Sequence, residues 1–90
     1  MTREKTSPRE QSGDDLGHEY QLILYNDDHN SFDHVIRSLV EVCGHDEIQA
    51  EQCAVITHFR GKCDIRRGSR RLLSRMRMSL QKRDLTVEIE

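Results

Sequence analysis

The spacing of apolar side chains switches repeatedly between a helical and a strand-like period along this chain, which limits the folds it can adopt. A helix returns side chains to one face every 3.6 residues, whereas a strand does so every second residue. Between residues 32 and 43 the apolar positions follow the helical period: Phe32, Val35, Ile36, Leu39, Val40 and Cys43. This segment predicts an amphipathic helix, which Asn30 or Ser31 can begin as the N-cap and Gly44 can end.

Three other segments have the composition of β-strands. Residues 20–25 (YQLILY) are apolar on both faces, and the turn-forming residues 26–28 follow them directly. Residues 62–66 alternate in polarity, which predicts a short strand with Cys63 and Ile65 facing inward. Residues 85–89 alternate Leu, Val and Ile with polar side chains, as expected of an edge or half-buried strand.

Two further helices complete the pattern. Asp46 lies three residues before Gln49, which resembles a capping box and predicts that a second helix begins there and ends at Gly61. The apolar residues expected to continue one face of this helix are Ile48, Val55, Ile56 and Phe59. A third amphipathic helix is expected after a turn and N-cap at residues 68–69. Its apolar residues are Leu72, Leu73, Met76 and Leu80.

The elements follow in the order strand, helix, helix, strand, helix, strand. This order predicts an α+β fold, a two-layer sandwich in which three helices cover a three-stranded, mainly antiparallel sheet. A chain of 90 residues can support only one hydrophobic core, and we expect it in residues 18–90. Residues 1–17 contain the only proline, many charges and a single leucine, so they are expected to form a flexible N-terminal extension.

Several classes of protein are not expected. The longest clearly apolar run, residues 22–25, is far too short to span a bilayer, and the polar N-terminus lacks the apolar stretch of a signal peptide, so a cytoplasmic protein is expected. No glycine-rich phosphate loop or activated nucleophile is evident, so neither enzyme activity nor a cofactor is expected. A metal site built on Cys43 and His45 is an alternative, but such residues at a helix end more often serve packing.

The charges are distributed unevenly along the chain. Residues 60–90 hold ten of the fourteen Lys and Arg residues but four of the sixteen Asp and Glu residues. The third helix carries most of this basic charge, at Arg70, Arg71, Arg75, Arg77 and Lys82. Such a face could neutralise phosphates, but no aromatic residues for base stacking accompany it. A solvated helix face is therefore the expected interpretation, and no nucleic-acid partner is predicted.

Asn26 and Asp27, at the end of the first strand, together with His58, near the end of the second helix, suggest a binding site. A protonated amine has three N–H donors that need acceptors from different directions. An amide oxygen, a carboxylate and a neutral imidazole can supply them. Taken alone, these residues also fit an ordinary turn and a surface histidine.

Residues 20–90 resemble ClpS, the adaptor of the bacterial ATP-dependent Clp protease. The resemblance rests on the strand followed by residues 26–28 (NDD), the apolar helix after it, the interval to His58, and the segment from His58 to Lys62 (HFRGK). It implies a non-enzymatic adaptor that binds proteins whose first residue is Leu, Phe, Tyr or Trp. The adaptor would deliver these proteins to a ClpA-type AAA+ unfoldase.

The resemblance also implies roles for individual residues. The α-amino group of the bound protein would be held by Asn26, Asp27 and His58, with Asp28 and Asn30 on the pocket rim. The side-chain pocket would be lined by Phe32, Val35, Ala54 and Thr57. Many family members carry Met at the position of Phe32, which lies beside the bound side chain. The alternative is a protein-interaction domain that lacks such binding. The expected fold also resembles the C-terminal domain of the ribosomal stalk protein, which is a domain of that kind.

Overall fold

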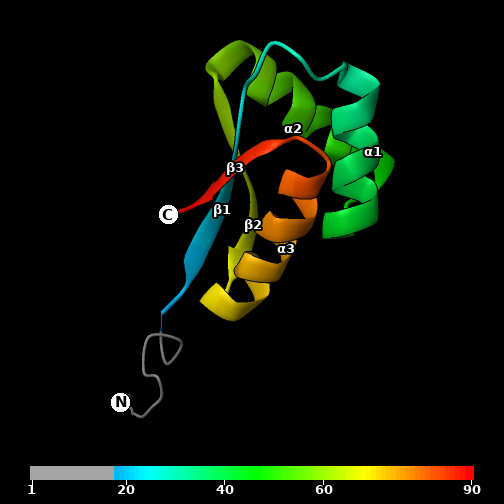
Figure 1. Cartoon of the computed structure of the whole chain (residues 1–90). Helices are drawn as coiled ribbons and strands as arrows, with labels where there is room; N and C mark the ends of the chain where they lie inside the picture. The colour runs from blue at the N-terminus through cyan, green and yellow to red at the C-terminus, as the bar shows by residue number, and fades with distance from the viewer. Residues whose placement is uncertain (1–17) are drawn as a thin grey trace.

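Three antiparallel strands and three helices make up residues 18–90, the part of the chain that the computed structural model describes (Figure 1). In chain order they are β1 (Tyr20–Tyr25), α1 (Phe32–Cys43), α2 (Glu47–Arg60), β2 (Lys62–Gly68), α3 (Arg70–Lys82) and β3 (Thr86–Ile89). This confirms the predicted α+β fold and its order of elements. The predicted flexible extension, residues 1–17, lies outside the described residues.

The first strand is the centre of the sheet, whose order is β2-β1-β3. Both neighbours run antiparallel to β1, so that Tyr25 at its end pairs with Lys62 on one side and Thr86 on the other. The chain therefore leaves β1 between the starts of β2 and β3. A backbone bond of 2.9 Å from the Asn26 N–H to the Gly61 carbonyl fixes this exit against the end of α2.

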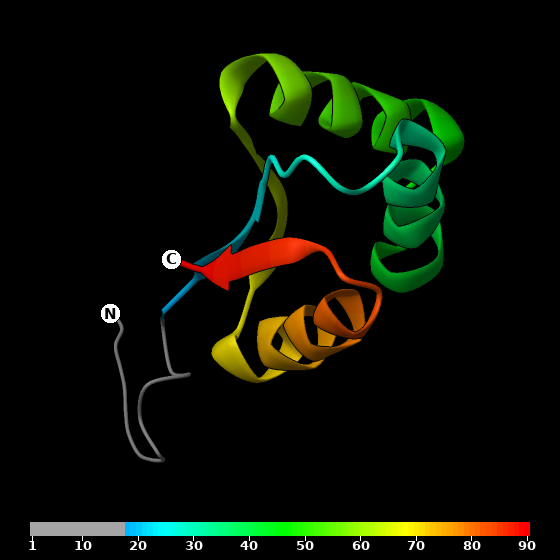
Figure 2. The same ribbon diagram turned by 45° about the horizontal axis from the view of Figure 1, so that its top comes forward.

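The core lies where the three helices are arranged around one face of the sheet (Figure 2). Its largest fully buried side chains are Leu22, Leu24, Leu39, Leu73, Leu80 and Val87. Removing such side chains from water is the main stabilising contribution in a domain of this size. β2 extends to Gly68, two residues beyond the predicted strand, because β1 pairs with it as far as Tyr20.

The helix boundaries follow from their capping residues. The hydroxyl of Ser31 accepts a hydrogen bond from the His34 N–H at 3.1 Å and begins α1, so Ser31 rather than Asn30 is the N-cap. Asp46 does the same for α2, accepting from the Gln49 N–H at 2.7 Å. Gly44 and Gly61 end these helices with φ values of 74° and 92°, where a side chain would be strained.

The buried face of α2 differs from the apolar face predicted for it. Small side chains point into the molecule: Ala50, Cys53, Ala54 and Thr57. The four residues predicted to continue one apolar face are exposed instead, from 39% for Val55 and Ile56 to 79% for Phe59. Small residues let α2 approach its neighbours closely, which leaves no room for larger ones on that side.

None of the helices within residues 18–90 has both the length and the apolar character that a bilayer crossing needs.

Candidate functional site

A cavity of about 50 Å³ lies beside the end of β1, between the loop of residues 26–31, the start of α1 and the C-terminal half of α2. Its lining residues are Leu24, Tyr25, Asn26, Asp27, Phe32, Val35, Ala54, Thr57 and His58. These include all seven residues named above for the α-amino group and the side-chain pocket. The loop after β1, α1 and α2 thus place the polar residues proposed for the α-amino group beside the residues proposed for the side-chain pocket.

Asp27 is the anchor of the loop. One carboxylate oxygen accepts from the backbone N–H groups of His29 and Asn30, at 3.2 and 3.0 Å. The other accepts from the Asn30 side-chain amide at 2.9 Å and from the Thr86 hydroxyl at 3.4 Å. Aspartate side chains commonly close turns in this way. Since β3 supplies Thr86, the loop is tied to the sheet as well as to itself.

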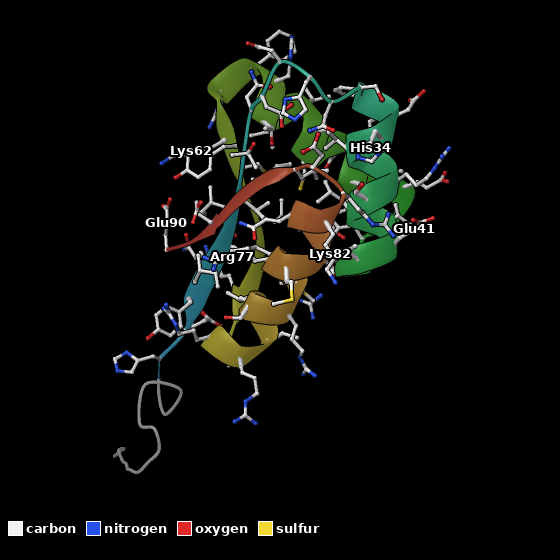
Figure 3. All side chains as sticks on the ribbon, in the orientation of Figure 1. His34, Glu41, Lys62, Arg77, Lys82 and Glu90 are labelled. Carbon is white, nitrogen blue, oxygen red and sulfur yellow. The ribbon has the colours of Figure 1, made fainter. Side chains whose placement is uncertain are left out.

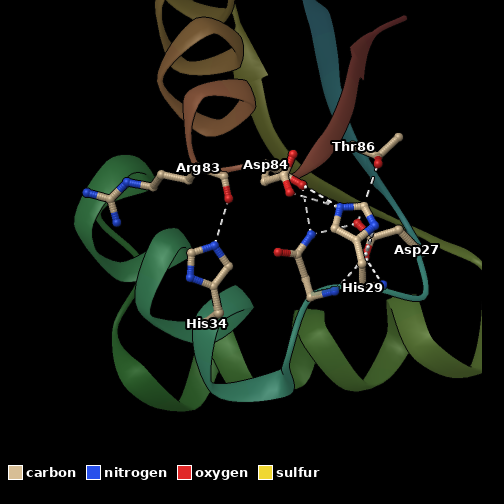
Figure 4. Close-up of polar contacts among 7 residues, drawn as sticks. Asp27, His29, His34, Arg83, Asp84 and Thr86 are labelled. Carbon is tan, nitrogen blue, oxygen red and sulfur yellow. Dashed lines mark hydrogen bonds and ion pairs between the residues drawn. The ribbon is translucent and has the colours of Figure 1, made fainter.

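A second set of contacts joins the loop and the start of α1 to the turn between α3 and β3 (Figure 4). The Asn30 amide donates to the Asp84 carbonyl at 2.8 Å, and the His29 Nε2 atom lies 3.2 Å from the same oxygen. The His34 Nε2 atom lies 2.7 Å from the Arg83 carbonyl oxygen. Asp84 has a φ of 73°, the left-handed region, which aspartate tolerates better than most residues.

Burial alone would raise the pKa of the Asp27 carboxyl, whose side chain is 14% exposed. The hydrogen bonds from the Asn30 side chain and from the backbone of Asn30 and His29, together with the nearby His29 ring, outweigh burial and lower the pKa below its ordinary value. Ionised Asp27 therefore stabilises the folded state. This stabilisation is complete above the ordinary carboxyl value and is lost as the pH falls through the lower folded value.

We expect a measurable consequence in acid unfolding. The variant Asp27→Asn lacks the charge, so it should be less stable than the wild type at neutral pH. The gap in free energy of unfolding should narrow as the pH falls from about 5 to about 2, because the wild-type carboxyl becomes protonated there. Urea unfolding at several pH values measures the gap. A gap that does not change over this range would contradict the account of Asp27.

Asn26 and His58 place side-chain polar atoms at the cavity that have no hydrogen-bond partner within residues 18–90. Both are exposed, and neither side chain makes a hydrogen bond to another residue within 18–90. The His58 ring packs edge-on against Phe59, with ring centroids 4.9 Å apart. An amide oxygen and an imidazole nitrogen thus remain available beside a carboxylate, an arrangement suited to a small cation with several N–H donors.

The apolar part of the cavity has a buried wall on α2 and an exposed residue on α1. Ala54 and Thr57 are 4% and 5% exposed, and the Thr57 hydroxyl is occupied by a bond of 2.7 Å to the Cys53 carbonyl. Phe32 is 43% exposed and is the most accessible of the apolar lining residues. The two predicted rim residues are placed differently from one another. Asp28 is exposed and does not line the cavity, while Asn30 lies behind Asp27 and supports it.

Asp84 and Thr86 support this loop, and sequence reasoning missed both. They lie more than fifty residues from Asp27 along the chain, and only the pairing of β3 with β1 brings them close. The one available signal was Asp84 itself, because an aspartate directly after a helix is typical of a turn with positive φ. It indicates a turn but not what the turn contacts.

A larger groove, of about 570 Å³, lies between α1 and α3, but it has a different character. Its charged residues include Arg75, Lys82 and Arg83, and Arg83 pairs with Glu41 at 2.6 Å. Figure 3 shows the side chains of Lys82 and Glu41 on these two helices. This groove has no convergent set of uncommitted acceptors, so the smaller cavity is the better candidate for a specific ligand.

The metal alternative gains no support from the described residues. No group of three or more His, Cys, Asp or Glu side chains within residues 18–90 could hold a metal ion. Cys43 is buried, and burial raises its pKa to about 11. The His45 Nε2 atom lies 2.8 Å from the Ile65 carbonyl oxygen, so this ring connects α2's entry loop to β2.

Comparison with known proteins gives a family and a fold. The family model for the ATP-dependent Clp protease adaptor protein ClpS matches residues 16–88. No curated protein matches the chain by sequence. Among solved structures, that of Agrobacterium tumefaciens ClpS2 bound to L-phenylalaninamide has a TM-score of 0.73 and 20% sequence identity, over 80% of this chain and 94% of the other. At this identity the likeness establishes the shared fold.

Proposed function

Because the chain belongs to the ClpS family of ATP-dependent Clp protease adaptors, we propose that its cavity receives the first residue of a substrate protein. The substrates are proteins with a bulky hydrophobic N-terminal residue, namely Leu, Phe, Tyr or Trp. The adaptor delivers them to a ClpA-type unfoldase for degradation. Members of this family are not enzymes, and the cavity is accordingly a recognition site.

The observation that supports this proposal most is the division of the cavity into two parts. Asn26, Asp27 and His58 form a polar part, which suits a protonated α-amino group. The apolar part suits the first side chain, and its residues are Phe32, Val35, Ala54 and Thr57. A free α-amino group occurs only at the start of a chain, so the two parts together would select a terminus and a side chain at once.

The roles within the polar part follow from the contacts that each residue already makes. Asn26 and His58 are the direct acceptors in this proposal, because their side chains are exposed. Asp27 supplies the negative charge and holds the loop that carries Asn26. Asn30 supports Asp27 from behind, whereas Asp28 is exposed and lies outside the lining.

Phe32 sets the size of the side-chain pocket in this proposal. A volume of about 50 Å³ corresponds to roughly two water molecules at the density of liquid water. A leucine or phenylalanine side chain needs more room. Phe32 is exposed at the mouth and can rotate outward, whereas Ala54 and Thr57 are fixed on α2. L-phenylalaninamide, the ligand of the Agrobacterium ClpS2 structure, has the same two features, a free α-amino group and a bulky side chain.

The division of the chain also belongs to this proposal. Residues 18–90 would form the adaptor core, and residues 1–17 a flexible extension that the unfoldase engages during transfer. The expected place of action is the cytoplasm, where the Clp protease and its substrates meet.

Fluorescence anisotropy with labelled peptides tests the proposed specificity. We expect a Leu-initiated peptide to bind with micromolar affinity or tighter, and at least tenfold more tightly than the same peptide starting with Ser. The reason is that Ser leaves the apolar part of the cavity unfilled. Equal binding of the two peptides would contradict the side-chain pocket. No binding to any of the four bulky first residues would favour an interaction domain without this activity.

A further inference from the structure

The outward face of α2 carries a row of apolar side chains that the proposed site does not use. Ile48 and Phe59 are 70% and 79% exposed, and Val55 is 39% exposed. Figure 2 shows α2 along the edge of the molecule, with no other described element lying over its outer side. Isolated apolar residues on a surface are common, but three on one side of a helix, from its first turn to its last, form a candidate interaction surface.

The spacing of this row fits helix-to-helix packing. Ile48, Gln52, Val55 and Phe59 follow one another at intervals of four, three and four residues. This is the spacing of the a and d positions in a coiled coil. The row lies directly opposite the buried face formed by Ala50, Cys53, Ala54 and Thr57, so it projects furthest from the molecule. We call these four residues, 48, 52, 55 and 59, the outer seam of α2.

We propose that the outer seam binds the outer seam of a second copy of this chain, with the two α2 helices antiparallel. In this orientation Ile48 faces Phe59 of the second copy, and Gln52 faces Val55. The two outermost contacts are then both between large apolar side chains. A two-fold axis between residues 53 and 54 relates the copies, so the interface is self-complementary and closed.

The charges on α2 favour the same orientation. Its N-terminal end carries Asp46, Glu47 and Glu51, while Arg60 ends the helix and Lys62 follows it. Antiparallel packing places each acidic end beside the basic end of the other copy. The helix dipoles also oppose one another in this arrangement. A parallel arrangement would instead bring like charges together at both ends, and so it is disfavoured.

The size of the seam predicts a weak dimer. A helix of 14 residues is about 21 Å long, and contact along one such helix is smaller than a standard stable interface. We therefore expect a dissociation constant on the order of 100 µM, so that the protein is monomeric when dilute. This inference does not depend on the proposed peptide binding, because the cavity residues on α2, namely Ala54, Thr57 and His58, are not part of the seam.

Disulfide trapping with Ile48→Cys and Phe59→Cys tests the orientation. In the proposed dimer residue 48 of one copy meets residue 59 of the other, whereas the two copies of residue 48 are roughly 16 Å apart along the helices. A disulfide cannot span that separation. Under mild oxidation a mixture of the two variants should give mostly the mixed dimer, identified by its intact mass. Wild-type protein controls for the native cysteines, of which Cys63 is partly exposed.

Sedimentation equilibrium up to millimolar concentration tests the interface itself. We expect Phe59→Ser to abolish the dimer and Arg60→Glu to weaken it at least fivefold, while the same charge change on α3, Arg75→Glu, leaves it unchanged. Phe59 and Arg60 are exposed, so thermal unfolding should show that both variants fold. A wild-type protein that stays monomeric throughout would overturn the proposal. Equal yields of the disulfide between two copies of one variant and the disulfide between the two different variants would also overturn it.

Discussion

Replacing Asp27 with alanine is expected to lower the affinity for a Leu-initiated peptide at least 30-fold. The substitution removes the negative charge proposed to face the α-amino group, and removing one member of a desolvated charged pair costs about 2–5 kcal/mol. It also removes the acceptor of four hydrogen bonds that fix the loop carrying Asn26. The free energy of unfolding should therefore fall by about 1–3 kcal/mol as well. Fluorescence anisotropy measures the first effect, and urea unfolding the second.

Two further variants separate the binding effect from the stability effect. Asp28→Ala removes the neighbouring carboxylate, which is exposed and does not line the cavity, so it should change both quantities little. His58→Ala should lower the affinity at least tenfold without changing stability, because the His58 side chain makes no hydrogen bond within residues 18–90. If Asp27→Ala binds the peptide as tightly as Asp28→Ala does, the assignment of the polar part is wrong.

The first helix shows what the sequence determines locally. Its apolar residues repeat at the helical period, and its start and end are marked by Ser31 and Gly44. Each of these signals lies within a few residues of the structure it specifies. The strands were predictable for the same reason, since the apolar run of residues 20–25 and the alternation in residues 62–66 and 85–89 are local properties. The extra length of β2 was not, because it depends on pairing with β1.

The second helix shows where local pattern fails. Large apolar residues dominate any measure of periodicity, so Ile48, Val55 and Phe59 defined the predicted face. The buried face is made of small residues instead, because α2 packs closely against its neighbours. Whether a helix buries large or small side chains depends on the distance to the next layer, which a single segment does not specify.

In the candidate site, too, some features were predictable from the sequence and others were not. The turn after β1 and the position of His58 were visible in the sequence, and the resemblance to ClpS grouped them with the apolar residues. The supports from Thr86 and Asp84 depend on β3 lying beside β1. Contacts of this kind arise from the completed fold. This is why sequence reasoning identified the lining of the cavity but not what holds its loop.

Acetylating the peptide is expected to weaken binding at least as strongly as the Asp27→Ala substitution. An acetyl group removes the positive charge and replaces the amine with a larger amide that has a single N–H. The acceptors of Asn26 and His58 would then have at most one N–H donor between them, and Asp27 would lose its counter-charge. The side chain and the rest of the peptide stay the same. The comparison therefore isolates the α-amino group from the apolar pocket, which other changes to the peptide do not.

Isothermal titration calorimetry of the wild-type protein with one Leu-initiated peptide, free and acetylated, is the most direct measurement. We expect the free peptide to bind at micromolar concentration or below, and the acetylated peptide to bind at least 30-fold more weakly. Equal affinities would mean that no group in the cavity recognises a chain terminus. The proposed role in recognising N-terminal residues would then be wrong.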